Sequence, residues 1–469
     1  MAKFSLYRDD LLSQEDMQSI HETALDILHE VGLAVFRDDL RETAQRAGLR
    51  VREDRVFFEP QVVEEYLTER RRRAAKDPPL PRDDDYKLYI GASQYCHHVH
   101  EIKSDKVVPF TTDLLIEVTK FVDTLAERGV GSSPPGCPLD VAPELQRLAQ
   151  FRIGAENLRS GSWNPMTDSP PQMVAYIFAM AEVMGRPVRQ LPVHLVSPLR
   201  LAGQSLDVAL HFQEQIECIH IGNMPAAGAS APILPFGALA QSAAEVLGSF
   251  VVLSIATDTT IDFQMRVLPF DLRATAMVMG TPETFLYDLA IWEMNDFYGY
   301  QRHHDRGSGR INTMASFPGS QAAAERASLM AVGALLGARG FGAGVLRLDE
   351  VFSPEQLLID CEIKDHVQRL LQGLTVEEGN YDWVDMVRKG SEGDFMSLDS
   401  TLDNYQQSYW YSRLFERTLP GWRDVDPEIM HNRALELYHE SLDRYDYELD
   451  PQRRNELDHI WEQAVQSLA

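Results

Sequence analysis

Cysteine is scarce in this sequence, and no two of its four cysteines form a C-x-x-C pair. Their scatter argues against a disulfide framework or a zinc finger, and it favours a reducing compartment such as the cytoplasm. The first residues contain no apolar signal core. The longest apolar run, residues 243–256, contains Glu245 and is too short to span a bilayer. We therefore expect a soluble, cytoplasmic protein. The four cysteines are Cys96, Cys137, Cys218 and Cys361.

Nucleotide-binding motifs are also missing, since neither G-x-G-x-x-G after the first predicted strand nor G-x-x-x-x-G-K-[ST] occurs. Basic residues are outnumbered, 44 against 71 acidic residues, which gives a net charge of -27. Such a charge argues against nucleic acid or an anionic membrane as a partner. It is explained by a solvated acidic surface and only weakly favours a cationic substrate. The hydrophobic content of 44% is enough for a large core.

Short apolar runs alternate with longer amphipathic stretches between residues 86 and 375. Repeated strand–helix alternation predicts a parallel sheet of the α/β class. About eight such units in nearly 300 residues fit a TIM (β/α)8 barrel better than an open sheet. The predicted strands are 86–90, 130–133, 160–163, 191–196, 218–221, 259–265, 311–317 and 340–346, and the predicted helices are 144–158, 171–184, 206–215, 238–256, 282–297, 321–337 and 354–372.

The chain divides into three predicted parts. Residues 1–85 form an N-terminal helical subdomain and a linker, residues 86–375 form the barrel, and residues 376–469 form a C-terminal helical extension rich in aromatic residues. The basic run 70–73 is interpreted as a solvated helix end in preference to a phosphate site. The aromatic extension favours a homo-oligomer.

Residues 20–67 predict a helix that stops at Gly32, a short helix, a turn and a third helix that begins near Pro60. The order of these pieces resembles the N-terminus of the trimethylamine methyltransferase (MttB-like) family. Members of that family demethylate methylated amines and pass the methyl group to a corrinoid protein. Further segments that resemble the family in order and spacing are 223–232 with 237–247, 280–283, 353–363, and 393–396 continuing through Thr401 to Trp422.

The sequence departs from this family at identifiable positions. Trimethylamine-specific members carry pyrrolysine, whereas this chain has only standard residues, which implies the non-pyrrolysine branch that acts on quaternary amines such as betaines. Residues 316–321 stand where many relatives have a Ser-Asp-x-Lys pattern, and Ser400 replaces a common histidine. These departures leave the substrate, and the activity itself, open. No D-x-H-x-x-G motif is present, so the resemblance implies a corrinoid (cobalamin) carried by a partner protein, with no bound metal.

Demethylating a quaternary ammonium requires a site that holds a cation and aims one methyl group outward. Aromatic faces and a carboxylate suit this task, and in a TIM barrel they would sit near the carboxyl ends of the strands. No catalytic residue is identified. A loop of small residues would let backbone N–H groups approach the cofactor, although a tight turn explains it equally well. The candidate substrate-binding residues are Trp163, His194, His220, Asn223, Asp262, Phe263, Tyr298, Tyr300, His303 and Phe317, and the candidate cofactor-binding residues are Gly228, Ala229 and Ser230.

Each candidate has a structural alternative. For Trp163, Phe263 and Phe317 this alternative is a place in the apolar core. His194 and His220 occupy equivalent positions in two similar strands, where they would bind a carboxylate or a metal, or serve as satisfied core histidines. Two other functions therefore remain open: a metal-dependent barrel lyase or hydrolase that uses these histidines with Asp262, and a non-catalytic amine-binding homologue. Zinc at His97, His98 and His100 is disfavoured because adjacent strand residues point to opposite faces.

Overall fold

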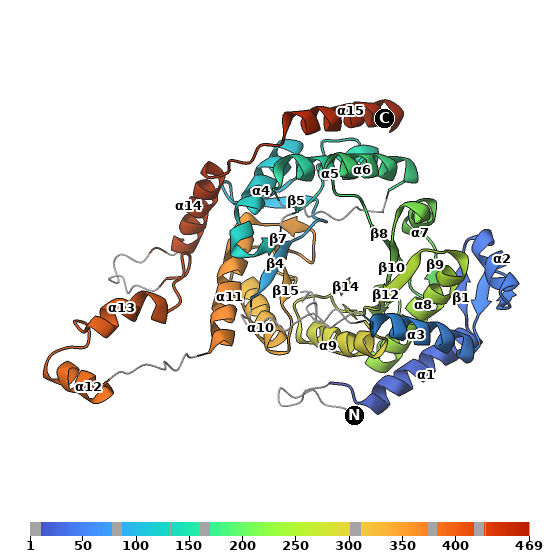
Figure 1. The fold of residues 1–469 in the computed structure, drawn as a ribbon, viewed down its shortest axis with the longest axis horizontal. Coiled ribbons are helices and arrows are strands. Elements are labelled where there is room, and N and C mark those ends of the chain that lie inside the picture. Colours follow the sequence, from blue (N-terminus) through green and yellow to red (C-terminus); the bar gives the residue numbers. More distant parts are fainter. Residues whose placement is uncertain are drawn as a thin grey trace.

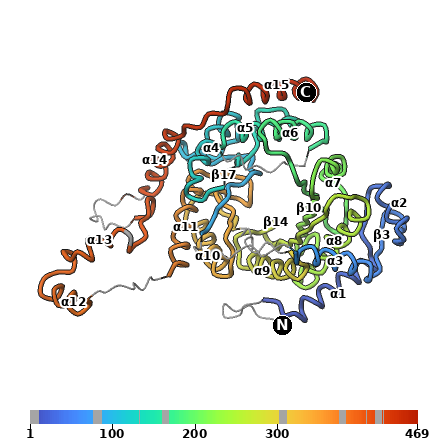
Figure 2. Tube along the Cα trace, viewed as in Figure 1, coloured from blue at the N-terminus to red at the C-terminus, as the bar shows by residue number. Residues whose placement is uncertain are grey.

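Strands surround the centre of the molecule and helices lie outside them (Figure 1). This computed structural model describes residues 11–76, 87–131, 133–159, 169–300, 311–373, 382–416, 426 and 428–468. The helices from α4 to α11 follow one another around the centre in chain order, as the trace in Figure 2 also shows. These outer helices are α4 (Thr112–Thr124), α5 (Gln146–Asn157), α6 (Pro171–Val183), α7 (Gln204–His211), α8 (Pro235–Ala256), α9 (Pro282–Phe297), α10 (Ser320–Leu335) and α11 (Pro354–Gln372).

Two three-stranded parallel sheets form the inner layer. In the first sheet β10 lies between β8 and β12, and in the second β4 lies between β15 and β7. Helices connect successive strands, because parallel neighbours require a crossover. The predicted strands at these places, and the predicted alternation with helices, are confirmed. The strands are β4 (Tyr89–Ala92), β7 (Val130–Gly131), β8 (Gln190–His194), β10 (Cys218–Gly222), β12 (Thr260–Gln264) and β15 (Gly340–Ala343).

The last of these strands pairs with the first, β15 with β4, as a closed barrel requires. Within the described residues, however, no strand joins β7 to β8 or β12 to β15. The predicted strand 160–163 lies outside the described residues. The prediction of a strand at 311–317 was wrong, because residues 311–315 form no regular strand. There the Thr313 hydroxyl accepts the N–H of Ala315, and the carbonyls of both residues accept N–H groups from a turn at 347–348.

The N-terminal helices share one apolar core with the first parallel sheet. Ile20 and Leu28 of α1 (Gln14–Glu30) belong to the same buried cluster as Leu191, Ile219 and Phe250. α1 begins with a capping box at Ser13 and ends before Gly32, whose φ is +72°. The other elements here are α2 (Asp38–Arg46), α3 (Pro60–Ala74) and a small sheet of β1 (Leu33–Val35), β2 (Arg50–Arg52), β3 (Arg55–Phe57) and β9 (Arg200–Leu201).

The C-terminal segment runs along the outside of the molecule. α14 (Ile429–Asp443) packs on α4 and α11, and α15 (Pro451–Leu468) packs on α6. In contrast, α12 (Trp383–Glu392) and α13 (Asp399–Ser408) extend away from the body, at the lower left of Figures 1 and 2. Their apolar side chains are largely exposed, as at Trp383 and Leu402. The segment is therefore part packed cover and part projecting arm.

α8 is a core helix in spite of its composition. It is long and apolar enough to cross a membrane, but 83% of its apolar window is buried inside the protein. Its packing partners include α1, α2 and β12. The remaining short strands are β5 (His98–Glu101), β6 (Lys106–Pro109), β16 (Val345–Leu346) and β17 (Val351–Phe352) in one sheet, and β11 (Ala226–Ala227), β13 (Leu268–Asp271) and β14 (Ala276–Met277) in another.

Candidate functional site

The inner face of the first parallel sheet carries polar side chains. Alternate residues of β8, β10 and β12, such as Ile219 and Phe263, are buried against the helices. The intervening residues point to the inner side, where His220 lies opposite Asp262 and His194 lies opposite Gly222. The parallel register therefore places His194, His220 and Asp262, three of the sequence candidates, on one face of the sheet.

Asp262 is paired with an arginine from the N-terminal helices. Arg70 of α3, with only 5% of its side chain exposed, reaches Asp262 Oδ1 at 3.1 Å from Nε and 2.6 Å from Nη2. Its guanidinium also donates to the carbonyls of Phe263 and Tyr298 and lies 4.1 Å from the centre of the Phe263 ring. The interpretation of residues 70–73 as a solvated helix end was therefore wrong for Arg70, which crosses from its helix into the site.

This pairing controls the charge of Asp262. Partial burial acts to raise the pKa of the carboxyl, but the neighbouring His220 and the positive charge of Arg70 outweigh burial and hold the pKa well below its usual value. Asp262 is consequently ionised at neutral pH. The Nδ1 of His220 lies 3.7 Å from Asp262 Oδ2, and the ring centre of Tyr300 lies 6.3 Å from that of His220. The site thus combines a fixed anion, an imidazole and a phenol ring.

Arg266 adds a second guanidinium two residues beyond the end of β12. Its side chain donates from Nη2 to Gln264 Oε1 at 3.4 Å. Asp288, Tyr95 and Tyr300 lie near enough to act on its charge, yet burial dominates and lowers the pKa of Arg266. Tyr95 comes from the loop after β4 in the second sheet. The sequence analysis did not identify this arginine.

A buried glutamate holds the loops at the carboxyl ends of β8 and β10. Glu245 of α8 is fully buried and accepts from Ser197 Oγ (2.8 Å), Leu199 N (3.0 Å), Asn223 Nδ2 (2.8 Å) and Gln241 Nε2 (2.9 Å). Burial raises the pKa of this carboxyl, although its four donors oppose the effect. A lone acid inside the apolar run 243–256 is the sequence signal that could have identified it.

Asn223 is one of the candidates, and its amide is fully engaged within the protein. Its Nδ2 donates to Glu245 and to Ser242, and its Oδ1 accepts from the N–H of Arg266 at 3.0 Å. Ser242 Oγ also donates to the carbonyl of Arg266 at 2.8 Å. The network therefore fixes the backbone of Arg266 from both sides. In this arrangement Asn223 contributes to the site by holding the backbone of Arg266 in place.

The remaining aromatic candidates do not gather on the inner face. Phe263 and Tyr298 are fully buried in the core, with ring centres 5.9 Å apart. Phe317 is 53% exposed and packs on His100, 5.7 Å away between ring centres. Their role in substrate binding stays a prediction, and for Phe263 the geometry matches the core alternative. Trp163 and His303 lie outside the described residues.

The expected cofactor loop is a closed turn. The N–H groups of Ala229, Ser230 and Ala231 all donate to the carbonyl of Ala226, and the N–H of Gly228 donates to the carbonyl of Ala231. Gly228 has a φ of +105°, which explains the need for glycine. The turn itself uses the N–H groups of Gly228, Ala229 and Ser230, which matches the tight-turn alternative, and the role of these residues in cofactor binding stays a prediction.

One histidine outside this face is held by protein contacts. His100 is fully buried, with Nδ1 at 3.2 Å from Ser353 Oγ and Nε2 at 2.8 Å from Asp105 Oδ1. His100 and Ser353 are buried, whereas the Asp105 carboxylate is exposed, so the serine hydroxyl of this Ser–His–Asp arrangement is shielded from solvent. In the part of the chain that the structure describes, no group of three His, Cys, Asp or Glu side chains is placed to hold a metal ion.

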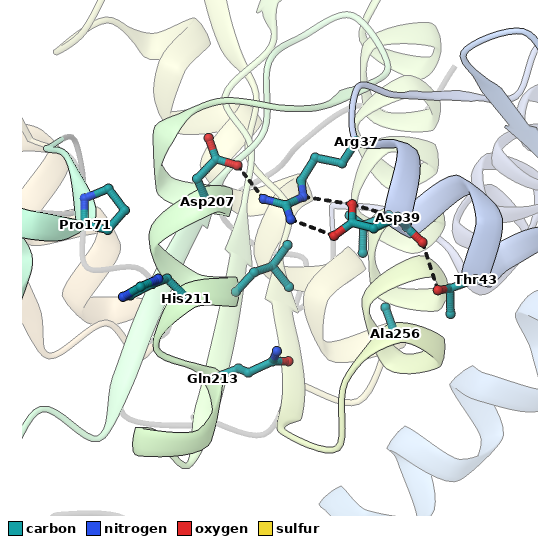
Figure 3. Close-up of a pocket in the computed structure, with 10 residues that line it drawn as sticks. Arg37, Asp39, Thr43, Pro171, Asp207, His211, Gln213 and Ala256 are labelled. Atoms are coloured by element: carbon teal, nitrogen blue, oxygen red, sulfur yellow. Dashed lines mark hydrogen bonds and ion pairs between the residues drawn. The ribbon is translucent and has the colours of Figure 1, made fainter.

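A surface cavity of about 380 Å³ lies near the opposite end of the strands. It is lined by residues that precede β10 and β12, such as His211, Gln213 and Ala256. Figure 3 shows Arg37 on its wall, where Arg37 pairs with Asp39 at 2.6 Å and with Asp207 at 2.8 Å. The cavity is thus separate from the polar inner face, and its arginine is already neutralised.

Comparison with known proteins points to one family. A family model described as trimethylamine methyltransferase (MTTB) matches residues 4–114 and 164–468. The chain is 21% identical over 425 residues to the glycine betaine methyltransferase of Desulfitobacterium hafniense strain Y51, covering 87% of each chain. It is 21% identical over 465 residues to the trimethylamine methyltransferase MttB of D. hafniense strain DSM 10664 / DCB-2, covering 94% of this chain and 91% of that one.

Other relatives match over a shorter stretch or by structure alone. The trimethylamine methyltransferase MttB of Methanosarcina thermophila is 28% identical over 222 residues, which is 47% of this chain and 45% of the relative. Among solved structures, the monomethylamine methyltransferase of Methanosarcina barkeri aligns with a TM-score of 0.45 and 10% identity, covering 97% of this chain and 89% of that one.

Proposed function

The chain belongs to the trimethylamine methyltransferase family, and from this premise we propose that it transfers a methyl group from a quaternary amine to the Co(I) corrinoid of a partner protein. This membership confirms the resemblance found in the sequence. The carrying observation is that the matched residues 4–114 and 164–468 include every part of the polar inner face. Arg70, His220, Asp262 and Arg266 all lie within them.

The transfer needs orientation and charge compensation more than acid–base chemistry. Co(I) supplies the nucleophile, the methyl carbon bonds to cobalt, and the electron pair of the broken C–N bond stays on nitrogen, so the amine leaves neutral. The protein's task is to hold the ammonium and to aim one methyl group at the acceptor. No proton has to move for the quaternary amine to react.

The inner face suits this task. Asp262 is ionised and supplies a counter-charge for an ammonium group. Tyr300, beside His220, supplies an aromatic face, and each such face contributes about 0.5–2 kcal/mol to cation binding, depending on desolvation. Arg70 already neutralises part of the Asp262 charge, so the aromatic contribution complements it. His220 lies beside this anion, with its Nδ1 at 3.7 Å from Asp262 Oδ2.

The architecture that we infer is a TIM barrel with its mouth at the carboxyl ends of β8, β10 and β12. The pairing of β15 with β4 and the parallel order of the strands support it. We further propose three parts of the chain: an N-terminal helical part at 1–85, a barrel at 86–375 and a C-terminal extension at 376–469. The protein would form a homo-oligomer in the cytoplasm and would act with a corrinoid-protein partner. The free cysteines support a reducing compartment, and the net charge of -27 disfavours nucleic acid and anionic membranes.

Methyl transfer to free cob(I)alamin tests the proposal. The purified protein is mixed with a panel of quaternary amines and trimethylamine, and the absorbance of the cobalt centre is followed. We expect loss of the Co(I) band with at least one quaternary amine. Asp262→Asn should reduce that rate, whereas Asp271→Asn, at a partly exposed hairpin carboxylate that pairs with Arg273, should not.

The same experiment separates the two other functions. Absence of transfer with tight amine binding by calorimetry would identify a non-catalytic amine-binding homologue. Absence of both, with stoichiometric metal in the purified protein, would favour the metal-dependent lyase or hydrolase that uses His194, His220 and Asp262. Either result contradicts the proposal.

A further inference from the structure

We infer that two copies of this chain associate through the projecting arm, residues 382–411, which docks on an arginine face of the other copy's N-terminal sheet. The arginine face is the outer side of the sheet formed by β2, β3, β1 and β9, and it carries Arg50, Arg52, Arg55 and Arg200. This contact gives the proposed homo-oligomer its interface and does not depend on the methyl-transfer reaction.

The register of the small sheet places three arginines in one row. Arg52 of β2 is paired with Arg55 of β3. In turn, Ala34 of β1 is paired with Arg55 on one side and with Arg200 of β9 on the other. Residues paired across strands point to the same face, so the three arginine side chains leave the sheet together, and Arg50 joins them two residues before Arg52. The opposite face is apolar and buried, and it carries Leu33, Val56 and Leu201.

The charges of the arginine face are not neutralised within the described residues. None of its four guanidinium groups forms an ion pair with a carboxylate there. Arg50 donates to the carbonyl of His29 at 2.8 Å and Arg55 to that of Gly32 at 3.0 Å, but a neutral carbonyl leaves the positive charge in place. Like charges that face one another across strands destabilise a sheet. A negatively charged partner would therefore stabilise this one.

Apolar surface accompanies these arginines. The guanidinium carbon of Arg50 lies 4.4 Å from the centre of the Phe57 ring, which is paired with Arg50 across the strands. Phe36 is 55% exposed, and because it follows the buried Val35 the alternation of β1 turns it to the same side as Ala34. The arginine face thus combines positive charge with aromatic contact area, and both arginine and aromatic residues are enriched in protein interfaces.

The arm has the complementary composition. Residues 382–411 contain six acidic residues and two basic ones. Asp385 pairs with both basic residues, Arg388 at 3.2 Å and Lys389 at 2.8 Å, so the other five carboxylates have no cation partner within the described residues. Such a concentration of exposed apolar groups indicates an interaction surface. The exposed large apolar side chains of the arm are Trp383, Val384, Val387, Phe395, Met396, Leu402, Tyr405, Tyr409 and Tyr411.

α13 presents its acidic and apolar groups as two adjacent stripes. Asp399 and Asp403 are four residues apart and lie one above the other on the helix. Leu402, Tyr405 and Tyr409 follow at spacings of three and four and form an exposed apolar stripe beside them. The Cβ atoms of an i, i+4 pair are about 5–6 Å apart. Neighbouring strands are about 4.8 Å apart, so the two aspartates match arginines on adjacent strands while the apolar stripe meets the phenylalanines.

The arm and the arginine face of one chain lie on opposite sides of the molecule. Figure 1 places α12 and α13 at the lower left, and β1 with α2 at the right. The base of the arm is fixed to its own body, because Ser412 Oγ donates to the buried Glu362 Oε2 at 2.6 Å and Leu414 is buried in the core. A chain's own arm therefore does not cover its own arginine face. A second copy supplies both the acidic groups and the apolar area that this face lacks.

Sedimentation equilibrium of the full chain tests the contact. We expect the unmodified protein to have a mass above the 53.1 kDa of one chain. Reversing the face with Arg52→Glu and Arg200→Glu, or the arm with Asp399→Lys and Asp403→Lys, should raise the dissociation constant at least about 100-fold, because like charges would then meet. A chain with all four reversals should associate again. Arg189→Glu with Arg273→Glu, at exposed arginines elsewhere, is the matched control and should leave the mass unchanged.

Three results would overturn the inference. These are a monomeric unmodified chain, an oligomer whose mass survives either reversal, and a chain with all four reversals that stays dissociated. Circular dichroism checks that each variant is folded. If a reversal does not fold, the neutral pairs Arg52→Gln with Arg200→Gln and Asp399→Asn with Asp403→Asn replace it and should weaken association by a smaller factor. Because the measured quantity is mass, failure of this contact leaves the proposed methyl transfer untouched, and failure of methyl transfer leaves the contact untouched.

Discussion

Replacing Arg70 with methionine removes the cation that crosses from α3 into the site. Methionine keeps an unbranched apolar stem on the Phe263 ring but has no hydrogen-bond donors. The change leaves Asp262 without its closest partner and leaves the carbonyls of Phe263 and Tyr298 without the guanidinium. We expect Arg70→Met to destabilise the native state and to weaken the connection between the N-terminal helices and the sheet.

The expected magnitude follows from the burial of the two partners. Breaking a buried ion pair by removal of one partner costs about 3–5 kcal/mol. Because 33% of the Asp262 side chain is exposed, water compensates part of the loss, and the lower end applies. We therefore expect the free energy of unfolding to fall by about 3 kcal/mol. Asp262→Asn should recover part of this loss in the double variant, with a coupling of about 1.5 kcal/mol.

Urea unfolding followed by circular dichroism measures the effect, provided that the slope of the transition is unchanged. Arg72→Met is the matched control, since Arg72 lies on the same helix, is 66% exposed and pairs with Glu69 at 2.8 Å. Arg72→Met should lower the free energy of unfolding far less than Arg70→Met. An Arg70→Met effect as small as that of Arg72→Met, or the absence of coupling to Asp262, would refute the reasoning.

Two further predictions concern the buried network and a close backbone contact. Burial raises the folded-state pKa of Glu245 above its unfolded value of about 4.3, so the native state binds this proton more tightly than the unfolded state does. The stability of the unmodified protein relative to Glu245→Gln should therefore rise as the pH falls from above the folded-state pKa towards about 4.3. Urea unfolding of both proteins at pH 7.5 and pH 5 measures this difference, and a smaller difference at pH 5 would contradict the prediction. A Cβ at Gly136 would lie 2.1 Å from the Cys96 carbonyl oxygen, so Gly136→Ala should lower the stability measured by thermal unfolding by about 2–3 kcal/mol. Gly91→Ala is the control, and it should cost much less because the space around the new Cβ is open. Equal losses in the two variants would contradict this explanation.

Local alternation was enough to predict the strands of the first sheet. Ile219 and Ile221, or Ile261 and Phe263, mark a strand with one buried face, and the same pattern placed His220 and Asp262 together. The prediction of a strand at 311–317 was wrong for a reason that the alternation of apolar residues cannot reveal. Thr313 uses its hydroxyl on the local backbone, and that competition with strand pairing becomes visible only in three dimensions.

The charged partners of the site were harder to predict. Arg70 and Asp262 are 192 residues apart, and the four consecutive arginines at 70–73 do not indicate which one is buried. Arg266 lies after the predicted end of its strand, so neither periodicity nor a motif distinguishes it from a surface arginine. Glu245 did leave a signal, because an acid within an apolar helix must find donors when it is buried.

The most direct test of the proposed function follows one labelled methyl group. The protein is incubated with cob(I)alamin and a quaternary amine that carries ¹³C in its N-methyl groups, and the corrinoid and the amine are analysed by NMR. We predict one labelled methyl on cobalt for each tertiary amine formed, at a rate that depends on Asp262. Unlabelled corrinoid with intact amine, for every amine that the protein binds, would contradict the assignment as a methyltransferase.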